Sequence, residues 1–259
     1  MISFIENLIF RNRRLVVVLF LLLTIFMVWQ ASHLKIDAGF AKMLPLKHPY
    51  MQTYLEHRDA FGGANRVVIA IKAREGDIFT PEFFEVLAEA TDEVFFIPGV
   101  DRTRVMSLYT PNVRFTEVVE DGISGGNVIP DDFEPTEEGL AKVRENILKS
   151  NYMGRLVAND FSAAIIAAEL LEFNPATGEK LDYLGVADEL ESIRQKFSTH
   201  EVGVDFDYHI IGFAKVIGDI AAGVARVVLF FLVAFFITVV FVYFYSQSAK
   251  LTRSSSAAH

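Results

Sequence analysis

Two long apolar runs bracket the chain and set its predicted organisation. Residues 15–34 and 227–245 contain no Asp, Glu, Lys or Arg. A helix of about 20 residues rises about 30 Å, which is the thickness of the hydrocarbon core of a bilayer. We therefore expect transmembrane helices at residues 15–34 and 223–245, with residues 35–222 between them as a domain large enough to have its own core.

The charges divide along the same boundaries. Residues 35–222 carry 18 Lys or Arg and 32 Asp or Glu, which gives a net charge of −14. The two ends together carry 6 Lys or Arg and 1 Asp or Glu, which gives a net charge of +5. Because basic residues stay on the cytoplasmic side of membrane spans, we expect both termini in the cytoplasm and the acidic domain outside it. In a bacterium, this topology corresponds to a multi-pass protein of the inner membrane with a periplasmic domain. A nucleic-acid binder would instead carry a basic patch on its folded domain.

The two ends of the chain have their own predictions. Within residues 1–14, apolar side chains recur at helical spacing, at Phe4, Ile5, Leu8 and Ile9. This pattern predicts an amphipathic helix on the cytoplasmic membrane surface. A cleaved signal peptide is the alternative, but its cleavage site requires a small residue where Trp29 stands. Residues 246–259 are expected to be a cytoplasmic tail, either truncated or ending in residues left from cloning.

The central domain begins with one predicted β-α-β unit. A short helix is expected over Pro49–Phe61, ahead of a β-branched strand over Arg66–Ala73. Thr80 has the position of an N-cap, with Pro81 at the first helical position. Pro98 and Gly99 end that helix, and Asp101–Leu108 is predicted to be the next strand.

A second unit follows after residues 109–135, which are predicted to be mostly irregular. Thr136 begins an incomplete capping box, because Gly139 stands where the reciprocal Glu would be. The apolar face of that helix is predicted to consist of Leu140, Val143, Ile147 and Leu148. A strand, a helix and a strand are then expected over Phe161–Leu171, Leu184–Phe197 and Val202–Ile211. Two such units predict an α+β, ferredoxin-like split β-α-β sandwich, with helices on one face of a four-stranded sheet.

Candidate chemistry is sparse. The absence of cysteine excludes disulfides, Cys-ligated zinc and thiol nucleophiles, and no phosphate-binding loop or zinc-protease motif occurs. Asp205, Asp207 and His209 alternate along the last strand, so they share one sheet face and form a weak candidate metal site. The competing interpretation is the solvated face of a half-buried strand. We expect no catalytic residues, no cofactor and no enzymatic activity.

Small residues recur where the second apolar run begins. Gly218 and Ala222 are four residues apart, and Ala225 continues the same narrow face. Small side chains let helices approach closely inside a membrane. The alternative is that they ease a bend between the domain and the span.

Several local stretches carry a resemblance to a known family. They are Phe61-Gly62, Ile78-Phe79-Thr80, Ile97-Pro98-Gly99-Val100, Val105-Met106-Ser107-Leu108 and Ile211-Gly212. In this order and spacing, between two spans, they resemble the start of resistance-nodulation-division (RND) transporters, in the MMPL-type and hopanoid or lipid exporter branch. The resemblance implies a porter domain in a proton-driven exporter of hydrophobic or amphiphilic substrates such as lipids, hopanoids or drugs.

The chain departs from that family in length. Family members have about twelve spans in two repeated halves, and their proton relay uses acidic residues of the fourth span. Neither run here contains a residue for a proton relay. We therefore expect this chain to be the N-terminal part of an exporter that does not transport alone. Its implied partners are the bilayer, the remaining spans and second porter domain, further copies or adaptor proteins, and the substrate.

Two other classes share this topology. A two-span regulator of polysaccharide chain length would have a periplasmic region dominated by long helices. A sensor with an extracytoplasmic ligand-binding domain would need a cytoplasmic output domain. Two strand-helix-strand units argue against the regulator, and the 14 residues after the second span are too few for the output domain of a sensor.

Overall fold

The computed structural model describes residues 12–33, 45, 47–61, 65–120, 122–174, 177–199 and 203–256. The chain divides into two compact units, residues 1–38 and 39–259, which we describe separately. The first unit contains α2 (Arg13–Ser32), a 20-residue helix that is long and apolar enough to span a membrane. It confirms the predicted helix at 15–34 with a shift of two residues. The amphipathic helix predicted from Phe4 to Ile9 lies outside the described residues.

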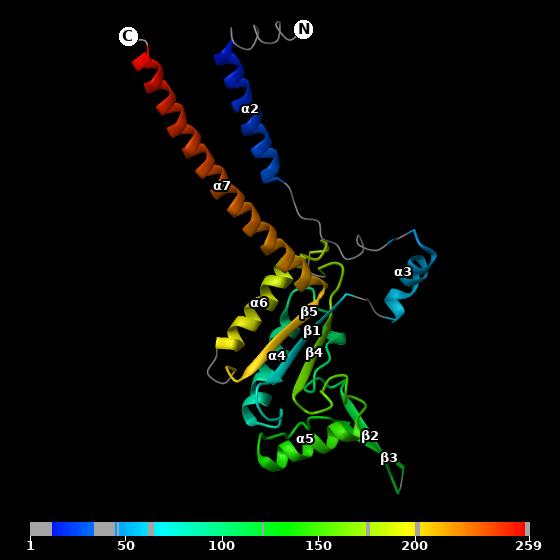
Figure 1. The fold of residues 1–259 in the computed structure, drawn as a ribbon. Helices are drawn as coiled ribbons and strands as arrows, with labels where there is room; N and C mark the ends of the chain where they lie inside the picture. Colours follow the sequence, from blue (N-terminus) through cyan, green and yellow to red (C-terminus); the bar gives the residue numbers. More distant parts are fainter. Residues whose placement is uncertain are drawn as a thin grey trace. The chain divides into compact units, whose positions relative to one another are not determined.

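The second unit is built on a three-stranded antiparallel sheet with the order β4–β1–β5 (Figure 1). The strands are β1 (Arg66–Ala73), β4 (Ala163–Glu169) and β5 (Phe206–Gly212). The register places Ile69 of β1 opposite Ile166 of β4 and Ile210 of β5. Ile69 and Ile166 are almost fully buried, because alternate side chains of each strand point into the core.

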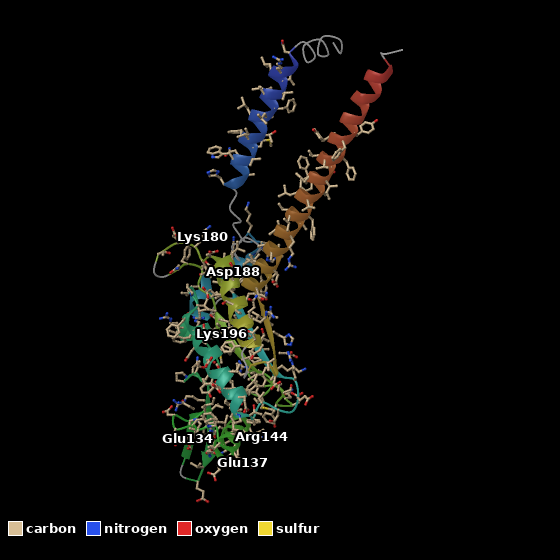
Figure 2. The ribbon with its side chains drawn as sticks, turned by 90° about the vertical axis from the view of Figure 1, so that its left-hand side faces the viewer. Glu134, Glu137, Arg144, Lys180, Asp188 and Lys196 are labelled. Carbon is tan, nitrogen blue, oxygen red and sulfur yellow. The ribbon has the colours of Figure 1, made fainter. Side chains whose placement is uncertain are left out.

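Helices α4 (Pro81–Phe96) and α6 (Tyr183–Thr199) cover one face of this sheet, as Figures 1 and 2 together show. The predicted start of α4 is confirmed, since the Thr80 side chain accepts a hydrogen bond from the Phe83 backbone NH and Pro81 is the first helical residue. The apolar face of α4, with Phe84, Leu87 and Val94, is buried. Lys196 of α6 forms an ion pair with Glu93 of α4 at 2.5 Å, which ties the two helices together.

Helix α5 (Glu137–Lys149) follows the predicted cap, with Thr136 accepting from the Gly139 NH. A side chain at Gly139 would meet the Glu134 carbonyl oxygen at 2.0 Å, which explains why no Glu completes the capping box. Leu140, Val143 and Ile147 are buried as predicted. The assignment of Leu148 to this face was wrong, because it is 61% exposed.

A hairpin occupies part of the region predicted to be irregular. Strands β2 (Arg114–Val119) and β3 (Gly122–Asn127) pair antiparallel over their whole length. Lys149 of α5 forms an ion pair with Glu117 of β2 at 2.6 Å, which attaches the hairpin to the helix.

The helix predicted over Pro49–Phe61 is confirmed as α3 (Pro49–Phe61), with the same first and last residues.

The strand predicted over Asp101–Leu108 is absent, and the four-stranded sheet with it. Residues Arg102–Arg104 form the 3-10 helix η2, capped by the Asp101 side chain, which accepts from the Thr103 NH. The β pairing of this region with β4 and the residue after it consists of single bridges, from Val100 to Leu170 and from Met106 to Ala167. The domain is therefore a mixed α+β structure with a three-stranded sheet that has a bridged edge and a separate two-stranded hairpin.

Helix α7 (Phe213–Ser256) is a single 44-residue helix that begins directly after β5. Its segment Phe213–Tyr245 is the second described stretch long and apolar enough to span a membrane. The predicted span at 223–245 lies inside this helix, which starts ten residues earlier. The small residues from Gly218 to Ala225 therefore lie within continuous helix and do not mark a break.

Candidate functional site

The junction between β5 and α7 connects the mixed domain to the apolar helix. Gly212 joins the two elements with φ +145°, and a Cβ there would meet the Arg66 carbonyl oxygen at 2.5 Å. Only glycine allows both this conformation and this approach. The next residues belong to the domain core, because Ala214 is fully buried and the Phe213 ring packs edge-to-face on Tyr183 at 5.1 Å.

Close helix packing extends the junction by a further turn. A Cβ built on Gly218 would lie 2.4 Å from the Ala187 Cβ of α6. The small residue predicted to contact another membrane helix thus contacts a helix of its own domain. Ala222 and Ala225 are exposed, and their packing against another span stays a prediction.

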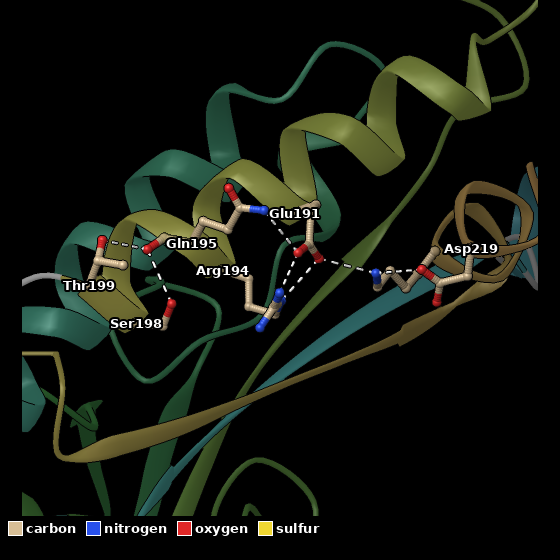
Figure 3. A network of polar contacts seen from close by, with 7 residues as sticks. Glu191, Arg194, Gln195, Ser198, Thr199 and Asp219 are labelled. Atoms are coloured by element: carbon tan, nitrogen blue, oxygen red, sulfur yellow. Dashed lines mark hydrogen bonds and ion pairs between the residues drawn. The ribbon is translucent and has the colours of Figure 1, made fainter. Parts of the chain in front are cut away.

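A polar network holds the same two helices together on their outer side (Figure 3). The Glu191 carboxylate accepts hydrogen bonds from Arg194, from Gln195 at 3.2 Å and from Lys215 Nζ of α7 at 3.1 Å. Lys215 also donates to Asp219 at 2.7 Å. Lys215 is 19% exposed, so its charge is largely withdrawn from water and depends on these two carboxylates.

The network keeps Glu191 ionised. Hydrogen bonding from Arg194 is the largest effect, and together with Lys215 it outweighs desolvation and lowers the pKa of Glu191 to about 2. The carboxylate therefore links α6 to α7 at any physiological pH. Because these contacts join α6 to α7, we interpret the junction as a mechanical connection.

The candidate metal site is not assembled. No group of three His, Cys, Asp or Glu residues among those described could hold a metal ion. Asp207 forms an ion pair with Arg74 at 2.9 Å, His209 is exposed, and Asp205 lies in the turn before β5. The competing interpretation, a solvated strand face, agrees with this arrangement.

A second polar cluster escaped the sequence analysis. Glu169, at the end of β4, accepts from Arg66 Nε and from Arg104 Nη1, each at 2.9 Å. The three side chains line an open cavity of about 350 Å³ beside Met106 and Ala167. Arg66 and Glu169 are cross-strand neighbours, a signal that becomes visible only once the strand register is known.

Comparison with known proteins gives one distant relative. No protein-family model matches the chain. Over 183 residues, 68% of this chain, it is 25% identical to the protein of Methanocaldococcus jannaschii named "Putative membrane protein MJ1562". The match covers 42% of that protein, so the chain spans less than half the length of its relative. The two apolar helices and this likeness agree on a membrane protein.

Proposed function

We propose that this chain is the first porter domain and flanking spans of an RND-type exporter that moves hydrophobic or amphiphilic substrates. The strand order supports a ferredoxin-like domain, because Val100 and Met106 bridge the outer edge of β4 where a fourth strand would pair. The domain lies in sequence between two apolar helices, as the family layout requires. In this proposal the substrate is moved and not converted, so the chain is not an enzyme.

One observation carries the proposal: the sheet continues without a break into α7. Gly212, the last residue of β5, is followed directly by Phe213 of α7, and Gly218 and Lys215 fix the first turns of the helix to α6. A movement of α7 in the bilayer is therefore transmitted to the sheet, which an exporter driven from its membrane part needs. The proton relay, the second porter domain and further copies or adaptor proteins are expected from the rest of the assembly.

The domain's helices weigh against a chain-length regulator. Its helices other than α7 have at most 17 residues, as in α6, whereas such regulators are dominated by long helices. The strand pairing in the domain core likewise favours a porter domain.

The experiment is substrate accumulation in inverted membrane vesicles. Vesicles from cells lacking the full-length exporter are compared with vesicles in which the full-length wild type, or the same protein with Lys215→Ala or the control Lys142→Ala, is restored at equal membrane levels. Lys142 is an exposed residue of α5 that pairs with Glu145. We expect proton-gradient-dependent uptake of a fluorescent amphiphile with the wild type and Lys142→Ala, and reduced uptake with Lys215→Ala. Equal uptake with and without the gene would overturn the proposal.

A further inference from the structure

The open cavity of about 350 Å³ lies on the sheet face opposite α4 and α6. On its sheet side the cavity is lined by Arg66, Ala167 and Glu169. These side chains point away from the two helices, because Ala168, at the alternate position of β4, is buried in the core. Residues between 103 and 112 form the other wall. Gly212 pairs with the residue after Arg66, so the cavity lies at the end of the sheet where α7 begins.

Two arginines from different elements converge in this cavity on one carboxylate. Glu169 Oε1 accepts a hydrogen bond from Arg66 Nε, and Glu169 Oε2 accepts one from Arg104 Nη1, each at 2.9 Å. The Glu169 side chain is 11% exposed, whereas those of Arg66 and Arg104 are 61% and 36% exposed. The carboxylate is thus the least exposed of the three groups, and a molecule that enters the cavity meets the two guanidinium groups first.

The arginines keep hydrogen-bond donors for a ligand. Arg66 uses Nε and Nη2 on Glu169, and Arg104 uses Nη1. Arg104 Nε lies 3.5 Å from Asp101 Oδ2, and Asp101 Oδ1 caps η2 by accepting from the Thr103 NH and hydroxyl. Among the residues that the structure describes, Arg66 Nη1 and Arg104 Nη2 have no hydrogen-bond partner. The two arginines and two carboxylates balance in charge, so an anion would be held here by directed N–H donors.

The side of the cavity away from Glu169 is apolar. Met106 bridges to Ala167, and both side chains are half-buried. Ala167 lies opposite Val68 of β1, which in turn lies opposite Ile211 of β5, and Ile211 is 64% exposed. We call Val68 and Ile211 the apolar row. The next row of the same face contains the exposed His209, so the apolar surface is one row wide and begins at the cavity.

We propose that the cavity binds an amphiphile with a phosphate group, which contacts Arg66 and Arg104 while its apolar chain contacts Met106, Ala167 and the apolar row. A phosphate group offers three terminal oxygens, enough to accept hydrogen bonds from two guanidinium groups on different elements. Ligand pockets have volumes of about 300–1,000 Å³, so a cavity of about 350 Å³ holds the phosphate and the first part of the chain. The inference rests on the proposed function in one respect, that the bound amphiphile is the molecule to be exported.

Photolabelling of the full chain in a detergent with a neutral headgroup tests this site. The probe is octyl phosphate with a photoreactive diazirine in its chain, and labelled peptides are identified by mass spectrometry. We expect labelled peptides from residues 103–112 and 163–171. Octyl phosphate should displace this labelling at a concentration at least tenfold lower than octyl glucoside or octyl trimethylammonium. Labelling confined to α2 and α7, or equal displacement by the three competitors, would overturn the proposal.

Inorganic phosphate separates an amphiphile site from a site for free anions. We expect it to leave the labelling unchanged at the concentration where octyl phosphate displaces the probe, because it lacks the chain that contacts Met106 and Ala167. Displacement by inorganic phosphate at the same concentration as octyl phosphate would overturn the amphiphile as the ligand.

A matched pair of arginine variants provides a second measurement. Arg66→Gln removes the charge and keeps an amide donor for Glu169, whereas the control Arg74→Gln lies at the far end of β1, where Arg74 pairs with Asp207. We expect labelling to fall at least fivefold with Arg66→Gln and to stay within twofold of the wild type with Arg74→Gln. Equal labelling of the two variants would contradict the site. If Arg66→Gln loses its resistance to protease, the competition series on the wild type decides.

The binding assay and the uptake assay fail separately. Displaceable labelling together with equal uptake with and without the exporter would overturn export and leave the binding site. Gradient-dependent uptake without displaceable labelling of the cavity peptides would overturn the binding site and leave export.

Discussion

Replacing Gly218 with Ala tests how tightly the long helix is bound to its domain. The added Cβ would lie 2.4 Å from the Ala187 Cβ, whereas carbon atoms in contact are about 3.8 Å apart. Helices α6 and α7 would have to separate by about 1.4 Å, and overpacking of this kind costs about 1–3 kcal/mol. Gly223 is the matched control, because a Cβ there meets nothing within 4 Å. Both substitutions gain about 1 kcal/mol of helix propensity.

We therefore expect Gly218→Ala to be less stable than Gly223→Ala by about 1–3 kcal/mol. The assay is pulse proteolysis of the full chain in detergent across a urea series, which reports unfolding of the domain. Adding Ala187→Gly to Gly218→Ala removes the overlapping methyl group and should restore most of the loss. Equal midpoints for the two glycine variants, or no rescue by Ala187→Gly, would refute the close contact.

Three further predictions concern the core, the junction and the topology. Ile69→Asp should cost more than about 4 kcal/mol and leave the domain sensitive to protease without urea, because Ile69 is 2% exposed; wild-type resistance would contradict the β1 assignment. The pKa of Glu191 is lowered to about 2, so its contribution to stability is present above its unfolded value of about 4.5 and is lost as the pH falls from there toward 2. Glu191→Gln should flatten this part of the stability profile, and an unchanged slope would contradict the network. In intact cells, an impermeant thiol reagent should label Glu138→Cys and not Ser254→Cys, and the reverse pattern would invert the topology.

Local signals explain which elements could be predicted from the sequence. Thr80 and Pro81 mark the start of α4 through a contact that spans only residues 80–83. The β-branched run of β1 can likewise be recognised as a strand without knowledge of the strands beside it. The hairpin was missed because β3 contains three glycines, which usually indicate a loop. A Cβ at Gly125 would meet the Phe115 carbonyl oxygen at 2.5 Å, so glycine is required there by the pairing with β2. The need for glycine at position 125 comes from its contact with another strand, so the sequence of β3 alone contains no pattern that indicates a strand.

The errors have similar causes. Asp101 caps a 3-10 turn through the Thr103 NH, and this short-range bond replaces the strand expected over Asp101–Leu108. At the junction, Glu191 and Lys215 are 24 residues apart on different helices, so neither charge was distinguished from ordinary surface charge. The spacing of small residues was interpreted as packing against another membrane span, whereas Gly218 lies against Ala187 of the domain's own helix. Only the structure showed that the contacting helix is α6.

In the proposed exporter, the continuity of α7 couples the tilt of this helix in the bilayer to the domain. The first turns of α7 pack in the domain, and the 23 residues of 223–245 are enough to cross a bilayer with some tilt. The 28 residues from Gly218 to Tyr245 rise about 40 Å, so a tilt of about 5° displaces one end relative to the other by about 3.5 Å. Because the first turns of α7 are fixed to α6, that displacement reaches the whole sheet. In the proposed exporter, a change in bilayer thickness that alters the tilt of α7 would therefore move the domain with it.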